Sequence, residues 1–449
     1  MSVLLGDEAA LKAMWNVKGA SGTVPCIFCW NIVAARSGLP EVDSTGNLVP
    51  HTCTDVSKLK LRSDSDFAGA AQMLVRERPL RTVGNFKTLE QSLGVNYDPE
   101  GMLFDPSCPL KPVSSTMYDW LHCYLVNGIF QTEVNLFLPA LVRAVGNHGV
   151  VVQYLRSFNA PAEYRSNLKG AIDAFEKSRT KDGWKPSASE ALCVYPILRV
   201  LTLETAFQDD GHKLMASCFM LLCRVLDLLS CIGKDMAVDV DQLEGLIVRH
   251  LDSFKGSYGS DDMVPKHHYV LHLMPLLRRH GQLISCFTHE RKHKSLKLFA
   301  NQISNAGSWF EKSVLREVTH SSMISLQNFR PSGVWLVNGR EGNRMKLRDA
   351  DLGFLRAIPD VMVATHACIH GLHAHRGDVC MLKIGTGQVG YVHAHVALGE
   401  QHMSLVTVWR QLGRNQFGTN DAARWIESSQ LNLCEATSIF SFLWLSRTR

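Results

Sequence analysis

A histidine-rich stretch restricts how this chain can fold. Residues 265–294 read PKHHYVLHLMPLLRRHGQLISCFTHERKHK and place His267, His268 and His272 within little more than one turn of a predicted helix. Histidines four or five residues apart on a helix share a face and can bind one metal ion. Glu290 follows among basic residues, which favour the ionised carboxylate that a divalent cation requires. These groups need ligand partners from elsewhere in the chain.

A cysteine pair far upstream is one source of such partners. The segment KGASGTVPCIFCWN carries Cys26 and Cys29 in a Cys-x-x-Cys arrangement. Two thiolates at this spacing chelate one tetrahedral zinc ion. The two missing ligands can come from nearby His51 and Cys53, or from the histidines of residues 265–294. A redox role would require a thioredoxin-like context, which the surrounding sequence lacks.

The composition indicates an intracellular protein. The thirteen cysteines are an odd number, and many lie in apolar helical runs, as expected for reduced thiols rather than a secreted disulfide framework. The N-terminus lacks the basic segment of a signal peptide. The most apolar run, Leu214–Gly233, is interrupted by Arg224 and Asp227, which predicts a core helix and no membrane span. The net charge of +5 neither requires nor excludes nucleic acid.

Asp7 stands between a predicted strand and a predicted helix. Ser2–Leu5 is a short apolar run, and EAALKAMW follows with apolar residues at helical spacing. The ordinary role of Asp7 is therefore a helix N-cap. The alternative is a metal-binding carboxylate at the end of a strand, where open sheets place their ligands.

Two regions of different pattern follow. Residues 115–254 predict successive helices with short loops, typical of an all-α bundle or insertion. Asp119 and His122 lie near its start, and by themselves they indicate an Asp near a helix start and a core histidine. From Phe329 the chain predicts a small β-barrel or sandwich, with a hairpin in GDVCMLKIGTGQVGYVHAHVALG. Its histidines are more typical of exposed strands than of a second metal site: His366, His370, His373, His375, His393 and His395.

Four segments in this order resemble a known family: LLGD with its helix, KGASGTVPCIFC, YDWLH, and PKHHYVLHL with CFTHERKHK. The resemblance is to the DDE transposases of CACTA-type (En/Spm) DNA transposons and their domesticated or decayed copies, over residues 1–325. It implies a mixed α/β and α fold, in which a partial RNase H-like core carries a long all-helical insertion before the C-terminal β domain. The expected boundaries are 1–113 for the core, 114–260 for the insertion, 261–328 for the helices returning to the core, and 329–449 for the β domain.

The resemblance also assigns roles to residues. Asp7 matches the second acid of a DDE triad, and Glu290, rather than Glu311 or Glu317, matches the third because it directly follows CFTH. Asp119 and His122 match the family's Asp-x-x-His element. The expected ligands of a structural zinc are Cys26, Cys29, His268 and His272, with His267 as an alternative to His268. The two ligand pairs lie at similar chain distances from Asp7 and from Glu290, which favours their meeting beside one site.

The chemistry implied is phosphoryl transfer on DNA in the nucleus, with Mg²⁺ held by Asp7 and Glu290. Arg278, Arg279, Arg291, Lys292 and Lys294 would contact phosphates, and a homo-oligomer is compatible with the family. Only six residues precede Asp7, so we expect the first acid to be lacking and catalysis to be lost or severely reduced. The alternative is a non-catalytic, zinc-stabilised DNA- or protein-binding module descended from such an enzyme. A redox or metal-handling protein is a third hypothesis.

Overall fold

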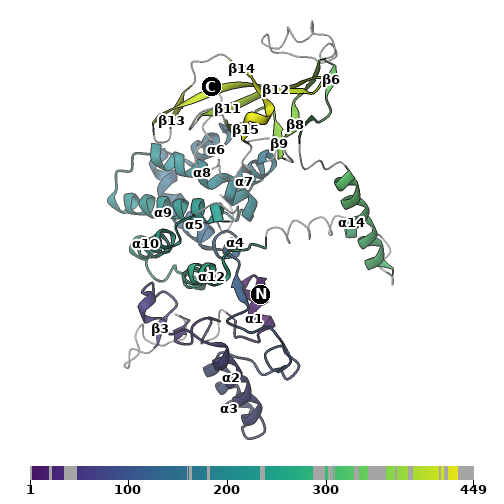
Figure 1. Ribbon diagram of the computed structural model, residues 1–449. Helices are drawn as coiled ribbons and strands as arrows, with labels where there is room; N and C mark the ends of the chain where they lie inside the picture. Colours follow the sequence, from purple (N-terminus) through teal and green to yellow (C-terminus); the bar gives the residue numbers. More distant parts are fainter. Residues whose placement is uncertain are drawn as a thin grey trace. The chain divides into compact units, whose positions relative to one another are not determined.

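The structure is a computed structural model (Figure 1). It describes residues 3–19, 23–34, 48–158, 160, 164–178, 183–232, 238–286, 299–301, 307, 309–327, 333–341, 361–369, 372–382, 388–413, 416–418 and 423–432. The chain divides into two compact units. The first comprises residues 1–152 and 173–290, and the second comprises residues 153–172 and 291–449. The fold is mixed α/β, as the sequence predicts.

The first unit begins with short strands and three helices and continues as a helical bundle. Its strands are β1 (Leu4–Gly6), β2 (Ile32–Val33), β3 (Val49–Pro50) and β4 (Thr116–Tyr118). Its helices are α1 (Glu8–Met14), α2 (Asp64–Glu77), α3 (Val83–Leu93), α4 (Trp120–Tyr124), α5 (Ile129–Val145), α8 (Ala188–Glu204), α9 (Asp210–Ile232), α10 (Val240–Tyr258), α11 (Pro265–Tyr269) and α12 (Leu273–His280), with 3-10 turns η2 (Val56–Lys58) and η4 (Val270–His272). Helices α6 (His148–Arg156) and α7 (Arg165–Ser178) each cross from one unit to the other along the chain.

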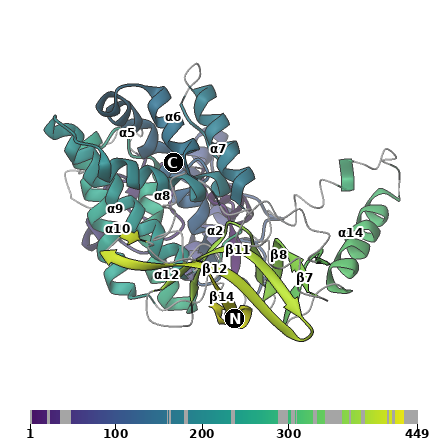
Figure 2. The same ribbon diagram turned by 90° about the horizontal axis from the view of Figure 1, so that it is seen from above.

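Polar residues at the helix starts explain where these helices begin. Ser63 and Ser187 form capping boxes with Asp66 and Glu190, at α2 and α8 respectively. Asp239 accepts two backbone hydrogen bonds at the start of α10. Behind these caps, α9 packs against α5, α8 and α10 through its apolar face, and Figures 1 and 2 both show α9 beside α10. Helices therefore predominate over residues 115–254, as the sequence pattern predicts.

The bundle region begins with a strand that the sequence pattern does not predict. Thr116–Tyr118 forms β4, which pairs in parallel with β1 in the register Leu4 to Thr116, Leu5 to Met117 and Gly6 to Tyr118. The helical pattern expected from residue 115 starts only at α4, because the backbone of residues 116–118 bonds to the distant N-terminal segment. Asp7 and Asp119 consequently follow neighbouring parallel strands at the same edge.

The second unit is mainly β. Its elements are α14 (Phe310–Gln327), β5 (Val334–Leu336), β6 (Arg340–Glu341), β7 (Met362–Ala364), β8 (His366–Ile369), β9 (Leu372–His375), β10 (Val379–Leu382), β11 (Val389–Leu398), β12 (Gln401–Gly413), β13 (Gln416–Gly418), β14 (Arg424–Glu427), the 3-10 turn η7 (Ser428–Gln430) and β15 (Leu431–Asn432). The expected hairpin is confirmed by the antiparallel pairing of β10 with β11. A larger sheet built on β10–β12 and a three-stranded sheet, β5-β8-β9, contribute buried residues to one apolar cluster.

Two helical stretches in the first unit are long and apolar enough to cross a membrane by length and composition alone, Trp120–Val145 and Asp210–Ile232. Of their most apolar windows, 56% and 44% are buried inside the protein. Core helices of soluble proteins pass the same test, so these stretches are weak evidence for a membrane.

Candidate metal centre

Four potential zinc ligands converge from two ends of the first unit. Cys26, Cys29, His268 and His272 are all buried, and their ligand atoms lie within 4.8 Å of one another. The Nε2 atom of His272 lies 3.4 Å from Cys26 Sγ and 3.6 Å from Cys29 Sγ. It also lies 3.1 Å from Nε2 of His268. The cysteine pair therefore meets the histidine pair and not a nearer candidate.

These separations match the corners of a zinc tetrahedron. Zinc bonds of about 2.3 Å to sulfur and about 2.0 Å to nitrogen place sulfur and nitrogen ligands about 3.5 Å apart and two nitrogens about 3.3 Å apart. The measured sulfur–nitrogen distances bracket the first value, and the nitrogen–nitrogen distance is close to the second. The donor set therefore fits a metal ion such as zinc.

Local interactions hold the cysteine loop in place. The backbone N–H of Phe28 donates to Cys26 Sγ at 3.3 Å. The ring of Phe28 packs against Tyr118 and against His272, each with ring centroids 5.1 Å apart. Because Tyr118 belongs to β4, the strand pair braces the loop and one of the histidines at once.

The histidine stretch is helical, with a change of pitch between its ligands. Pro265 occupies the first turn of α11, where its missing N–H costs no hydrogen bond. The 3-10 turn η4 follows and ends at His272. His268 and His272 are four residues apart, so their rings fall on the same face of the stretch.

Two of the four residues, Cys26 and His268, have pKa shifts that suit a divalent cation. Burial opposes ionisation of Cys26, but hydrogen bonding from Cys29 and the two nearby histidines hold the pKa of the Cys26 thiol well below its ordinary value. The pKa of Cys29 is raised by its hydrogen bond to Cys26 and by burial. Burial lowers the pKa of His268 and keeps that ring neutral. Metal binding requires thiolates and neutral imidazoles, and this site already favours one of each.

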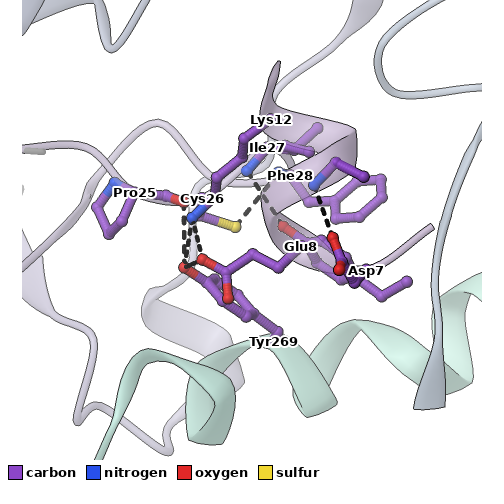
Figure 3. A network of polar contacts seen from close by, with 10 residues as sticks. Asp7, Glu8, Lys12, Pro25, Cys26, Ile27, Phe28 and Tyr269 are labelled. Atoms are coloured by element: carbon purple, nitrogen blue, oxygen red, sulfur yellow. Dashed lines mark hydrogen bonds and ion pairs between the residues drawn. The ribbon is translucent and has the colours of Figure 1, made fainter. Parts of the chain in front are cut away.

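A second polar network ties α1 to the histidine stretch beside this site. Figure 3 shows Tyr269 next to Glu8, Lys12 and Pro25. Lys12 pairs with Glu8, and its Nζ donates to the Tyr269 hydroxyl at 2.8 Å. That hydroxyl lies 3.0 Å from Glu8 Oε1 and 3.3 Å from the Pro25 carbonyl oxygen. Burial lowers the pKa of Lys12, while Glu8 opposes that shift.

The alternative ligands are directed elsewhere. His267 packs its ring 4.5 Å from that of Phe254, and its Nδ1 lies 3.0 Å from the Val264 carbonyl oxygen. Nε2 of His51 lies 2.9 Å from the Met263 carbonyl oxygen. The Cys53 thiol donates to the Asp55 carbonyl oxygen. None of the three belongs to the four-residue cluster.

The two strand-end acids serve as helix caps. Asp7 Oδ1 accepts from the backbone N–H of Ala10 at 2.6 Å at the start of α1. Asp119 is buried and caps α4, accepting from the backbone of Leu121 at 3.0 Å. Its other oxygen lies 2.5 Å from His122 Nδ1 and accepts from the backbone N–H of Cys286 at 3.2 Å. Asp119, His122 and Cys286 form a further group of close ligand atoms, although no sequence pattern singles out Cys286.

The remaining predicted site residues divide into two sets. The first set lies outside the described residues and consists of Glu290, Arg291, Lys292 and Lys294. Arg278 and Arg279 are described, and both interact within the protein. Arg278 forms ion pairs with Asp241 and Glu244 of α10, and Arg279 donates to the Val113 carbonyl oxygen at 2.8 Å.

Comparison of the sequence with protein-family models and with curated proteins gave no match.

Proposed function

We propose that this chain is a transposase-derived protein that acts on DNA and whose core is held together by a structural zinc ion. The observation that carries the proposal is the convergence of Cys26 and Cys29 with His268 and His272, about 240 residues downstream, next to the β1–β4 pair. In a relative within the wider group that the sequence resembles, the V(D)J recombinase catalytic subunit, such a zinc ion ties the helical insertion to the catalytic core.

The edge of the β1–β4 pair supports the catalytic part of the proposal. Asp7 and Asp119 follow adjacent parallel strands, and open α/β sheets bind ligands at the carboxyl ends of such strands. In an RNase H-like core this edge carries the acids that bind Mg²⁺, which supplies Lewis acidity for phosphoryl transfer. Cys286, which precedes Glu290 by four residues in the sequence, donates its backbone N–H to Asp119 at this edge.

A second candidate function, a non-catalytic zinc-stabilised DNA-binding module, is favoured by one observation. Both strand-end carboxylates are engaged in the fold, since Asp7 caps α1 and Asp119 accepts hydrogen bonds from three groups. A carboxylate that satisfies backbone N–H groups has fewer lone pairs for a metal ion. Under this alternative the zinc site and DNA binding remain, and cleavage is absent.

The decisive experiment compares cleavage of labelled DNA by three purified proteins in Mg²⁺ or Mn²⁺. These are the natural chain, Glu290→Ala, and Glu311→Ala as the matched control for a glutamate on the exposed part of α14. Catalysis predicts cleavage that falls at least a hundredfold in Glu290→Ala and is unchanged in Glu311→Ala. Cleavage that survives Glu290→Ala would refute the assignment of the third acid. DNA binding without cleavage in all three proteins would select the non-catalytic module.

A further inference from the structure

A second group of metal-binding side chains is enclosed in the helical bundle. Glu133 on α5, Cys218 on α9 and His250 on α10 are each fully buried. One ligand atom from each lies within 4.8 Å of the other two. The helices that carry them pack together in the first unit, and the three side chains belong to a different cluster from Cys26 and its partners.

The hydrogen bonding of this cluster is incomplete. Nε2 of His250 lies 2.6 Å from Oε2 of Glu133. The other oxygen of Glu133 and Nδ1 of His250 are buried with no hydrogen-bond partner in the described part of the chain. Whichever ring nitrogen carries the proton, polar atoms of this pair therefore stay unsatisfied.

The surroundings make that arrangement unfavourable without a further partner. Cys218 lies in an apolar cluster with Phe254 and Met263, against which Tyr258 also packs. A buried carboxylate is costly unless charge and hydrogen bonds compensate it, and a single imidazole compensates it only in part. A cation between the carboxylate, the ring and the thiol would compensate the buried negative charge and occupy the free oxygen of Glu133.

We propose that Glu133, Cys218 and His250 bind a second structural zinc ion. A thiolate, an imidazole and a carboxylate are all ligands that zinc accepts. The sulfur ligand favours zinc over magnesium or calcium, which prefer oxygen ligands. One tetrahedral position is left for water or for the Tyr258 hydroxyl, another buried group without a partner among the described residues. This ion fixes α5, α9 and α10 to one another, whereas the first zinc joins segments distant in sequence.

The test is the zinc content of four full-length proteins after gel filtration through a weak chelator. The proteins are the natural chain, Cys218→Ser, Cys26→Ser, and Cys223→Ser as a control. Cys223 is an equally buried thiol on α9 that does not belong to the cluster. We expect two zinc ions in the natural chain and in Cys223→Ser, and one in each of the other two variants.

The outcomes separate this site from the first. One zinc in the natural chain and none in Cys26→Ser would overturn the second site and leave the first. One zinc in the natural chain that persists in Cys26→Ser and disappears in Cys218→Ser would support the second site and remove the first. No zinc in the natural chain would overturn both.

Cobalt substitution gives a readout on the folded protein that does not depend on counting zinc. Sulfur-to-cobalt charge transfer grows with the number of bound thiolates, which is three if Cys26, Cys29 and Cys218 all coordinate. Cys218→Ser should lose about a third of that absorption, since one thiolate of three is removed. An intensity equal to that of Cys223→Ser would overturn the proposal.

Discussion

Lys12 and Tyr269 are buried polar residues that join the first helix to the histidine stretch without a metal ion. Each is largely shielded from water, with exposed fractions of 3% and 0%. Burying an ammonium group is tolerated here because the Glu8 carboxylate and the Tyr269 hydroxyl both contact it. The tyrosine hydroxyl thus has a stabilising role that its ring alone cannot fill.

We predict that Tyr269→Phe destabilises the zinc-bound chain by about 1–2 kcal/mol, because Lys12 and Glu8 lose a shared hydrogen-bond partner in a buried site. The measurement is urea unfolding at constant zinc concentration. Tyr124→Phe is the matched control, since the Tyr124 hydroxyl is buried with no hydrogen-bond partner among the described residues. That change should cost little or be stabilising, and equal losses in the two variants would contradict the prediction.

Residue type and spacing identify the two ligand pairs of the first cluster, which the family resemblance joins, but they do not identify the second cluster. Cys26 and Cys29 are close in sequence, as are His268 and His272, so each pair carries a visible metal-ligand spacing. Glu133, Cys218 and His250 stand singly on three helices, and only helix packing brings them together. The sequence feature that could have pointed to this cluster is an acidic residue, Glu133, inside the apolar run IFQTEVNLFLPALV.

At the scale of elements, periodicity predicts the bundle helices and the β10–β11 hairpin, because side-chain pattern alone specifies them. It does not predict β4, a three-residue strand whose partner β1 lies more than a hundred residues upstream. Such a short strand carries almost no pattern of its own, and non-local pairing defines it. The expected RNase H-like core stays a prediction that rests on this strand pair.

His395 makes the pairing of β11 with β12 sensitive to acid. The ring is buried and bonded to Ser404 across the two strands at 2.8 Å. Burial lowers the pKa of His395 to about 4, and His366 and His375 act in the same direction. The unfolded chain binds a proton below its ordinary pKa of 6.5, while the folded chain resists until about 4. The contribution of the neutral His395 ring to folding stability is therefore complete above pH 6.5 and is lost as the pH falls toward 4.

We predict that acidification from pH 6.5 to 4 costs this strand pair roughly 3 kcal/mol through His395. The measurement is hydrogen exchange of β11 and β12 amides, corrected for the intrinsic exchange rate at each pH. His395→Gln should lower stability at pH 7 and flatten the pH dependence. His320→Gln, on the exposed surface of α14, should leave the dependence unchanged. A dependence that persists in His395→Gln would assign the effect to other groups.

At the scale of the whole molecule, the net charge of +5 is too small for general attraction to DNA, so binding must depend on local cations. Arg278 is a poor source, since Asp241 and Glu244 already neutralise much of its charge. The Arg291, Lys292 and Lys294 cluster has no acidic residue between its members after Glu290. We therefore expect most of the charge that binds DNA phosphates to come from Arg291, Lys292 and Lys294, and little of it from Arg278.

We predict that the triple change Arg291→Ala, Lys292→Ala and Lys294→Ala reduces the slope of log affinity against log salt by up to about 2.7, or about 0.9 for each phosphate that the protein no longer neutralises. The measurement is binding of a labelled duplex at several salt concentrations. Arg278→Ala should leave the slope almost unchanged, because ion pairing within the protein keeps that guanidinium away from the phosphates. If Arg278→Ala lowers the slope while the triple variant does not, α12 and not residues 291–294 carries the DNA-binding charge.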